Sequence, residues 1–386
     1  MAKLKYISAA QAKPQITTIT IAGTWLANDT VTLKVAEKEV TYTAGASPTP
    51  TSVAAGLQAL CAASSDPEFR EVKTWVANSG VITATGTDGI PITIAVSKSS
   101  VSGTAVAATA QAATGPYFWD NVDNWDINAV PATNDEVYIE STDSIIKYGL
   151  PTSLTLSKLY VRLGSLGLPD RADGGYTEYR PKRPTITCTD VQIGSDVGKG
   201  PALCRLNLST AAAVVAVWGS ATRQDYAPVE LLTNSASASI NVLTGQVAIA
   251  PSGSDTSTVG TVRVGSNGSC VIGAGVTVTS VVSVGNCLCW ASPTNLTVDG
   301  GTTTIAGSAA VSGTTIVSDG TLVHKSSGTL AAVTLGPGQL DCSQDLRTKT
   351  ITSLTVKKGG QYKEPFGTVT ITTFVKGSDT ELLTAS

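Results

Sequence analysis

The chain has 386 residues, of which 42% are hydrophobic and 14% charged, and its formal net charge is −3. This length suits two or three domains, and the excess of apolar over charged residues excludes a disordered chain. No Lys/Arg-rich stripe is present, so we expect no nucleic-acid partner. No run approaches the roughly 18 apolar residues of a membrane span, so we expect no membrane contact.

The composition favours strands and tight turns. Thr and Val pack well on a pleated sheet, and 37 glycines supply turn positions. The seven cysteines are an odd number in a chain without a visible export signal, which predicts reduced and buried thiols. Cys287 and Cys289 are two residues apart and would face the same side of a strand. A metal site there is disfavoured because no second Cys pair or His cluster accompanies them.

Residues 1–13 are predicted to form an N-terminal arm, either disordered or ordered by a neighbour. The arm carries Lys3, Lys5 and Tyr6, which we take as candidate interaction residues. The segment lacks an apolar run long enough for a signal peptide. We therefore expect synthesis without export.

Residues 14–114 predict a small α+β attachment domain. Apolar residues alternate over 31–35 and 40–42, which predicts a hairpin with one buried face. Thr51 or Ser52 is expected to cap the one clear helix of the chain. Its apolar face is predicted to consist of Val53, Leu57, Leu60 and Cys61. Further strands are expected at 72–76, 81–85 and 92–96, and a last strand with a linker at 97–115.

An aromatic junction is expected at 115–149. Trp119 and Trp125 belong to a cluster of large aromatic residues just before the repeats begin. The end of a stack of strands exposes unpaired edges and an open core, so we interpret this cluster as an N-terminal cap. A carbohydrate-stacking platform is the alternative. Three aspartates at 120, 123 and 126 lack the Gly and Glu of a calcium loop, so we interpret them as turn residues.

From residue 150 to 386, short apolar-x-apolar strands ending in Gly or Asp recur. Strand ends separated by 14 to 21 residues lie at Val264, Val284, Val298, Val317, Leu335 and Val356. Strands of this kind cannot bury a face alone and must stack on one another. A propeller blade needs about 40 residues, twice this spacing. We therefore predict a mainly β fold, with a right-handed parallel β-helix (a β-solenoid) following the α+β domain.

A charged segment interrupts the repeat at 165–183. Long loops that leave a regular scaffold often carry function. The candidate residues in this loop are Asp170, Arg171, Tyr176, Glu178, Tyr179, Arg180 and Arg183. Paired carboxylates roughly 5–10 Å apart with flanking tyrosines would suit glycoside cleavage. The surplus of cations keeps carboxyl groups ionised, however, and favours anchoring of a neighbouring subunit.

Other catalytic patterns are missing from the sequence. His324 is the only histidine, and we interpret it as a surface or edge residue. No nucleophile elbow, P-loop, dinucleotide fingerprint or zinc spacing is present. We therefore predict no catalytic residue, no metal and no cofactor, and expect a protein that is not an enzyme.

Four segments of the chain carry a resemblance to bacteriophage and prophage structural proteins, which have no defined activity. TWLANDTVTLKVAEKEVTYTAG and SDPEFREVKTWVANSGVITATG resemble a module of those proteins. FWDNVDNWDINAVPATNDEVYI resembles the entry segment before β-helices in phage and large surface proteins. GLPDRADGGYTEYRPKRP resembles a similarly placed loop in those phage proteins. The resemblance implies a virion component made in the host cytoplasm, on the head or the tail.

Three hypotheses follow. The first is a non-enzymatic decoration, spike or fibre-like subunit whose partners are other virion proteins and further copies of the chain. We expect trimers, because solenoids associate side by side and phage appendages are often threefold. The second is a tailspike or receptor-binding protein that binds or cleaves host polysaccharide. The third, a bacterial surface adhesin, is disfavoured by the missing export signal.

Overall fold

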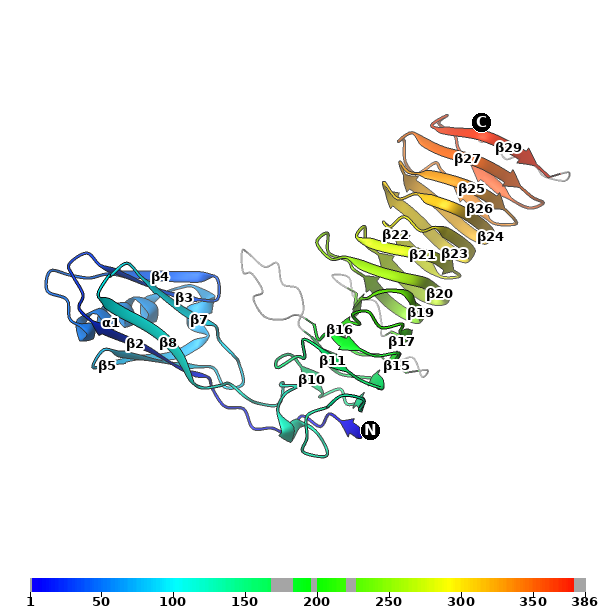
Figure 1. Cartoon of the computed structure of the whole chain (residues 1–386). Helices are drawn as coiled ribbons and strands as arrows, with labels where there is room; N and C mark the ends of the chain where they lie inside the picture. The colour runs from blue at the N-terminus through cyan, green and yellow to red at the C-terminus, as the bar shows by residue number, and fades with distance from the viewer. Residues whose placement is uncertain (1, 168–182, 196–199, 220–226, 378–386) are drawn as a thin grey trace.

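The computed structural model describes residues 2–167, 183–195, 200–219 and 227–377. The fold is mainly β, as predicted. A parallel β-solenoid of about 10 turns runs from residue 136 to 376, and a small β-sheet region with one long helix precedes it. Figure 1 shows the turns stacked along one direction from β10 to β29, with the sheet region to one side.

The solenoid is built from strands that pair in parallel with the turn above and the turn below. Its elements are β1 Lys3–Lys5, β9 Glu136–Ile139, β10 Ile145–Ile146, β11 Leu154–Thr155, β12 Lys158–Val161, β13 Ser165–Leu166, β14 Ile186–Thr187, β15 Asp190–Gly194, β16 Leu203–Asn207, β17 Val214–Trp218, β18 Val229–Leu232, β19 Asn234–Ile249, β20 Ser257–Ile272, β21 Val276–Ser283, β22 Asn286–Cys289, β23 Asn295–Gly307, β24 Val311–Ser326, β25 Thr329–Leu335, β26 Gln339–Asp341, β27 Lys349–Val356, β28 Gln361–Lys363 and β29 Val369–Lys376.

Columns of inward-facing side chains form the solenoid core. Ile240, Val262, Val281 and Leu296 follow one another in register through β19, β20, β21 and β23, and each is almost fully buried. Because side chains alternate across a strand, the residues directly before and after each of these four in its own strand face outward. Each turn therefore buries only half of its side chains, and stacking the next turn completes the core.

Glycines mark the corners, as the sequence pattern predicts. Gly301 and Gly320 both have positive φ angles, of 57° and 71°. A Cβ atom on Gly301 would lie 2.2 Å from the carbonyl oxygen of Gly285 in the turn below. Only glycine tolerates both the left-handed backbone and this close approach between turns. The irregular spacing of the repeat is absorbed by register shifts, for example between Val242 and Thr244.

The preceding region contains two antiparallel sheets around one long helix. Its elements are β2 Ile16–Gly23, β3 Thr30–Val35, β4 Lys38–Thr43, α1 Pro50–Ala63, the short α2 Pro67–Arg70, β5 Val72–Asn78, β6 Val81–Gly86, β7 Ile94–Lys98 and β8 Gly103–Gln111. The strand orders are β5-β6-β2-β8 and β4-β3-β7. The predicted hairpin is confirmed as β3 and β4. A second core, separate from that of the solenoid, fills this α+β region.

Two details of the predicted helix were wrong. The N-cap is Thr49, whose side chain accepts a hydrogen bond from the amide of Ser52, and Pro50 occupies the first turn. Proline fits that position because a backbone N–H there would have no intrahelical partner, so its absence costs no hydrogen bond. Leu60 is 41% exposed, whereas Ala54 is buried on the inner face.

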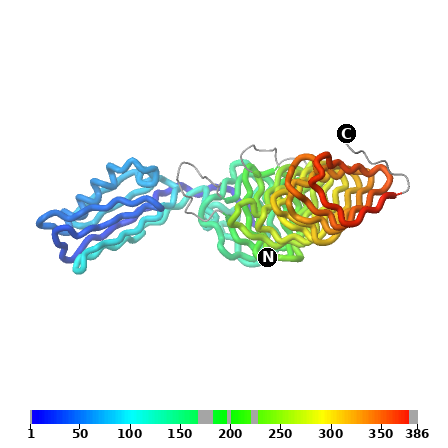
Figure 2. The backbone as a smooth tube through the Cα atoms, turned by 90° about the horizontal axis from the view of Figure 1, so that it is seen from above, coloured from blue at the N-terminus to red at the C-terminus, as the bar shows by residue number. Residues whose placement is uncertain are grey.

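The N-terminal arm is ordered by its own chain. Residues 3–5 form β1, which pairs in parallel with β9 at the base of the solenoid. The chain then leaves for the α+β region and returns beside its own outgoing segment, where the amide of Lys13 donates to the carbonyl of Thr114 at 2.8 Å. The α+β region is thus an insertion between two neighbouring strands of the solenoid. In Figure 2 this narrow connection separates the two bodies.

Among the described residues, no helix has the length and apolar character needed to cross a membrane.

Candidate functional site: the base of the solenoid

The structure gathers five of the predicted interaction residues at the base of the solenoid. Lys3, Lys5 and Tyr6 belong to or follow β1, and Trp119 and Trp125 lie in the segment that returns from the α+β region. A short 3₁₀ helix, η1 (Val122–Asn124), comes directly before Trp125. The candidates Asp170, Arg171, Tyr176, Glu178, Tyr179 and Arg180 lie outside the described residues.

Tyr6 closes the base of the core. Its ring meets that of Trp125 edge to face, with centroids 5.1 Å apart, and Trp125 meets Trp119 in the same way at 5.0 Å. The Tyr6 hydroxyl donates to the carbonyl oxygen of Pro116 at 2.7 Å, and the indole N–H of Trp125 donates to that of Trp119 at 2.8 Å. Burial raises the pKa of Tyr6 well above its ordinary value. The phenol therefore stays neutral and acts as a donor.

The two tryptophans fill the core. Trp119 is 2% exposed and Trp125 is fully buried. A ring that stacks on a sugar needs a free face, so these two cannot form the carbohydrate platform considered from the sequence. Their packing under the first turns is that of a cap, which covers the apolar end that the lowest strands would otherwise expose.

Two polar side chains that the sequence reading missed hold this base together. Asn124 is fully buried, and its amide group donates to the carbonyl oxygens of Gly115 and Phe118 while accepting from the amide of Ala10. Asp135 accepts from the amide of Ala2 at 2.8 Å. That hydrogen bond lowers the pKa of the Asp135 carboxyl group. Both side chains join segments that are far apart in the sequence.

The outer face of the first turns carries a ladder of alternating charges. Lys3 of β1 and Lys158 of β12 both lie in register with Glu136 of β9. Their ammonium nitrogens are 3.8 and 3.7 Å from the two carboxylate oxygens of Glu136. Lys5 forms an ion pair with Glu140 at 3.2 Å. A slip of β1 by one residue would break both contacts, so the charges help to select its register.

Two tyrosines stack beside this ladder. Tyr138 and Tyr160 lie in register, with ring centroids 5.0 Å apart. Their hydroxyls donate to Glu136 at 2.9 Å and to Asp190 at 3.4 Å. Burial and the adjacent carboxylate raise the pKa of Tyr138 to about 12, and the hydrogen bond from Tyr138 lowers the pKa of Glu136. Glu136 is therefore ionised at neutral pH and cannot serve as a general acid.

Arg183 lies away from the base, next to the loop that follows β19. Its guanidinium group forms an ion pair with Asp255 at 3.1 Å, and both side chains are largely buried. The sequence favoured anchoring of a neighbouring subunit by the cations of this segment. The partner of Arg183 belongs to the same chain, so this arginine anchors the end of the charged segment to the solenoid wall.

The structure corrects the prediction for His324, which is fully buried. It lies in β24 in register with Ile305 of β23, which in turn aligns with Cys289 of β22. The histidine therefore occupies a core column. Burial, together with the nearby Lys349, lowers its pKa to about 4. Neither ring nitrogen has a hydrogen-bond partner within the described part of the chain.

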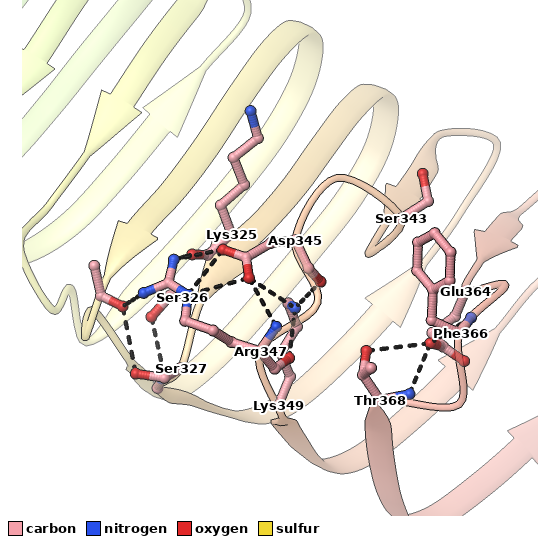
Figure 3. Close-up of polar contacts among 12 residues, drawn as sticks. Lys325, Ser326, Ser327, Ser343, Asp345, Arg347, Lys349, Glu364, Phe366 and Thr368 are labelled. Carbon is pink, nitrogen blue, oxygen red and sulfur yellow. Dashed lines mark hydrogen bonds and ion pairs between the residues drawn. The ribbon is translucent and has the colours of Figure 1, made fainter.

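Figure 3 shows a polar corner around Asp345, Arg347 and Lys349. Of these residues, Lys349 is the one whose charge contributes most to the lowered pKa of His324. The buried ammonium group of Lys349 donates to the carbonyl oxygens of Asp345 and Arg347 at 2.6 and 2.8 Å. The guanidinium group of Arg347 pairs with the Asp345 carboxylate and donates to the carbonyl oxygens of Gly307 and Lys325. The hydrogen bonds from Arg347 hold the pKa of Asp345 well below its usual range. This corner ties β23, β24 and β27 together and has a structural role.

All seven cysteines are free and buried, which confirms the prediction of reduced, interior thiols. Burial raises the pKa of Cys204 and of Cys289 to about 12. The thiolate is the nucleophile and the metal ligand, so these thiols are poor at both roles. In the described ranges, no three His, Cys, Asp or Glu side chains come together in a group that could hold a metal ion.

No protein-family model matches the chain, and neither the curated proteins nor the solved structures contain a match to it.

Proposed function

We propose that the chain is a non-enzymatic structural protein of a bacteriophage particle. In this proposal the α+β region attaches the chain, and the solenoid is a scaffold that projects or packs against other copies. The observation that carries the proposal is the double connection between the two parts. The chain leaves the solenoid after β1 and returns at β9, and these strands are paired. A load on the α+β region therefore reaches the solenoid through two strands of one sheet.

The electrostatics of the described residues also support a scaffold. A glycoside-cleaving site needs one carboxyl group with a raised pKa beside a second that is ionised. The described carboxyl groups with a resolved shift, Asp29, Asp135, Glu136, Asp341 and Asp345, all have a lowered pKa. Each is held ionised by hydrogen bonds from its neighbours. These carboxylates fit structural roles better than acid catalysis.

The assignment to a phage particle rests on sequence resemblance. Residues 24–45 and 65–86 resemble a module of phage and prophage structural proteins, residues 118–139 resemble the entry segment before β-helices in phage and large surface proteins, and residues 167–184 resemble a loop of those phage proteins. We propose other virion proteins and further copies of the chain as partners, with trimers as the starting hypothesis and the host cytoplasm as the place of synthesis. The chain would then enter the particle at the head or the tail.

Imaging of intact particles tests this proposal. Particles purified from infected cells are labelled with gold-conjugated antibody fragments raised against the α+β region, and particles made without this protein are the control. We expect label at regular positions on the head or the tail of complete particles. Particles made without this protein should carry no label. Purified particles that lack the protein would overturn the proposal.

Host-glycan binding is a second candidate, and the stacked pair Tyr138 and Tyr160 favours it. These rings lie on the outer face beside Glu136 and Asp190, and aromatic faces with adjacent carboxylates suit sugars. Calorimetry with host polysaccharide tests it, with Tyr160→Ala against Tyr117→Ala as the matched control. Binding lost only in Tyr160→Ala supports this candidate. Release of reducing ends that Glu178→Gln abolishes would contradict the non-enzymatic proposal.

A further inference from the structure

The α+β region has four edge strands, β5 and β8 in one sheet and β4 and β7 in the other. Three of them carry charged residues: Lys73 in β5, Lys38 and Glu39 in β4, and Lys98 in β7. Charged side chains, lysine above all, keep edge strands from pairing with other chains. The fourth, β8, has the sequence GTAVAATAQ and no charge, and with 9 residues it is the longest of the four.

One side of β8 is available for pairing. The strand pairs with β2 along its other side, and no second strand of the described chain pairs with it. From Gly103 to Thr109 its register with β2 is continuous, and the only shift lies beyond Thr109. This straight stretch contains neither the proline nor the bulge with which proteins protect an exposed edge. Val106, in its middle, is 59% exposed.

The sheet surface next to this edge is also uncharged. Its outward positions are Thr74, Val76, Asn78, Val81, Thr83, Thr85, Thr18, Thr20, Val106 and Ala108, which oppose one another across β5, β6, β2 and β8. Depletion of charge is what distinguishes the core of a protein interface from the remaining surface. The edge strand β8 and the sheet face beside it are therefore both uncharged.

We propose that β8 pairs antiparallel with β8 of a second copy of this chain, around a twofold axis near Val106. An antiparallel strand pair with itself is an isologous contact, in which the residue at the axis meets its own counterpart and every other residue meets the one equally far on the other side of the axis. Any charge near the axis would face a like charge, so a self-pairing strand must be neutral there. Among the four edges, only β8 is free of charge along its whole length, so it meets this condition for any position of the axis. The two four-stranded sheets then continue as one across the axis.

The pairing goes beyond the proposed function, because it names the surface and the symmetry through which two copies associate. It predicts a dimer contact in the α+β region, whereas threefold association was expected from the solenoid alone. If the experiment below finds no pairing through β8, the proposal that the protein is part of a phage particle is unaffected, because particle imaging tests that proposal separately.

Sedimentation of the full chain over a range of concentrations tests the pairing. We expect the wild-type protein to form dimers. Val106→Lys should raise the dimer dissociation constant about tenfold or more, because two ammonium groups then face each other across the axis. Val76→Lys is the matched control: this valine is 57% exposed on the same face but lies in β5, at the opposite edge. It should leave the dissociation constant unchanged.

A charge-swap experiment separates lost pairing from lost folding. Val106→Glu alone should also be monomeric, and an equimolar mixture with Val106→Lys should restore dimers, because opposite charges then meet. A wild-type chain that stays monomeric overturns the pairing. So does a dimer or trimer that Val106→Lys leaves intact, equal disruption by Val76→Lys, or a mixture of the two Val106 variants that fails to associate.

Discussion

Tyr6 and Trp125 meet edge to face under the first turn of the solenoid, with an interplanar angle of 84° between their rings. Tyr6 follows β1, and Trp125 lies in the segment that returns from the α+β region. The contact therefore closes the loop of chain that contains the whole inserted region. Both side chains are fully buried, so the first residues of the chain are part of the solenoid core.

Replacing Tyr6 should destabilise the base strongly. Removal of a buried aromatic side chain costs about 3–5 kcal/mol, so we expect Tyr6→Ala to lower the free energy of unfolding by that amount. Tyr6→Phe keeps the ring but loses the hydrogen bond from the hydroxyl to Pro116. This loss should lower the free energy of unfolding by about 1 kcal/mol. Denaturant unfolding followed by circular dichroism measures both. The neighbouring Ile7 is 45% exposed, and Ile7→Ala should behave like the wild type; a loss as large as that of Tyr6→Ala would contradict this view of the base.

The strand β1 should be held by its apolar side chain more than by its charges. Leu4 is almost fully buried, while Lys3 lies exposed beside Glu136. Leu4→Ala should cost about 2–5 kcal/mol, and Lys3→Ala should leave the unfolding midpoint close to that of the wild type. Hydrogen exchange of the β1 amides provides a local measure. Exchange in Lys3→Ala as fast as in Leu4→Ala would show that the ion pairs hold the strand.

The solenoid was predictable because its signal is local. The recurring pattern Val-x-Val-Gly, as at Val262 to Gly265, predicts both a strand and the corner that ends it within a few residues. The closure of the base was not predictable in this way. The segment Lys3–Lys5 is too short to show a period, and its neighbour Ala2 bonds to Asp135, 133 residues away. Nothing local indicates such a partner.

The position of His324 was missed for a different reason. Alternation along a strand makes one residue in two exposed, yet Leu322, Val323 and His324 are all buried. At this corner both sides of the strand are covered, so the period of two fails. Aligning the turns would have placed His324 beside Ile305 and Cys289 in one core column. The charged candidates from 170 to 180 lie outside the described residues, and their role stays a prediction.

The thiols should be protected by the fold. Burial raises the pKa of Cys204 to about 12, and a buried thiol reacts slowly with a disulfide reagent because it is neither ionised nor accessible. We expect the native protein to show almost no reaction with Ellman's reagent at neutral pH. The same protein in denaturant should titrate all seven cysteines. Fast labelling of the native protein, or fewer thiols after unfolding, would contradict the prediction.

The stability of the solenoid should depend on pH through His324. The pKa of this imidazole is about 4 in the fold, against 6.5 ordinarily. Between these values the unfolded chain binds more protons, so the free energy of unfolding falls as the pH drops from 6.5 towards 4. The full contribution is present above pH 6.5. Across this window the contribution of His324 to the free energy of unfolding should change by on the order of 3 kcal/mol, at about 1.4 kcal/mol per pKa unit. Denaturant unfolding across this window measures it.

His324→Leu is the matched variant for this prediction. Leucine fills the core column, does not titrate, and replaces a ring whose nitrogens have no hydrogen-bond partner among the described residues. The variant should therefore be at least as stable as the wild type at neutral pH and lose the slope between pH 4 and 6.5. Carboxylates such as Asp345 have a pKa lowered from 3.8, so their contribution is lost only at lower pH. A slope that persists unchanged in His324→Leu would show that another group carries it.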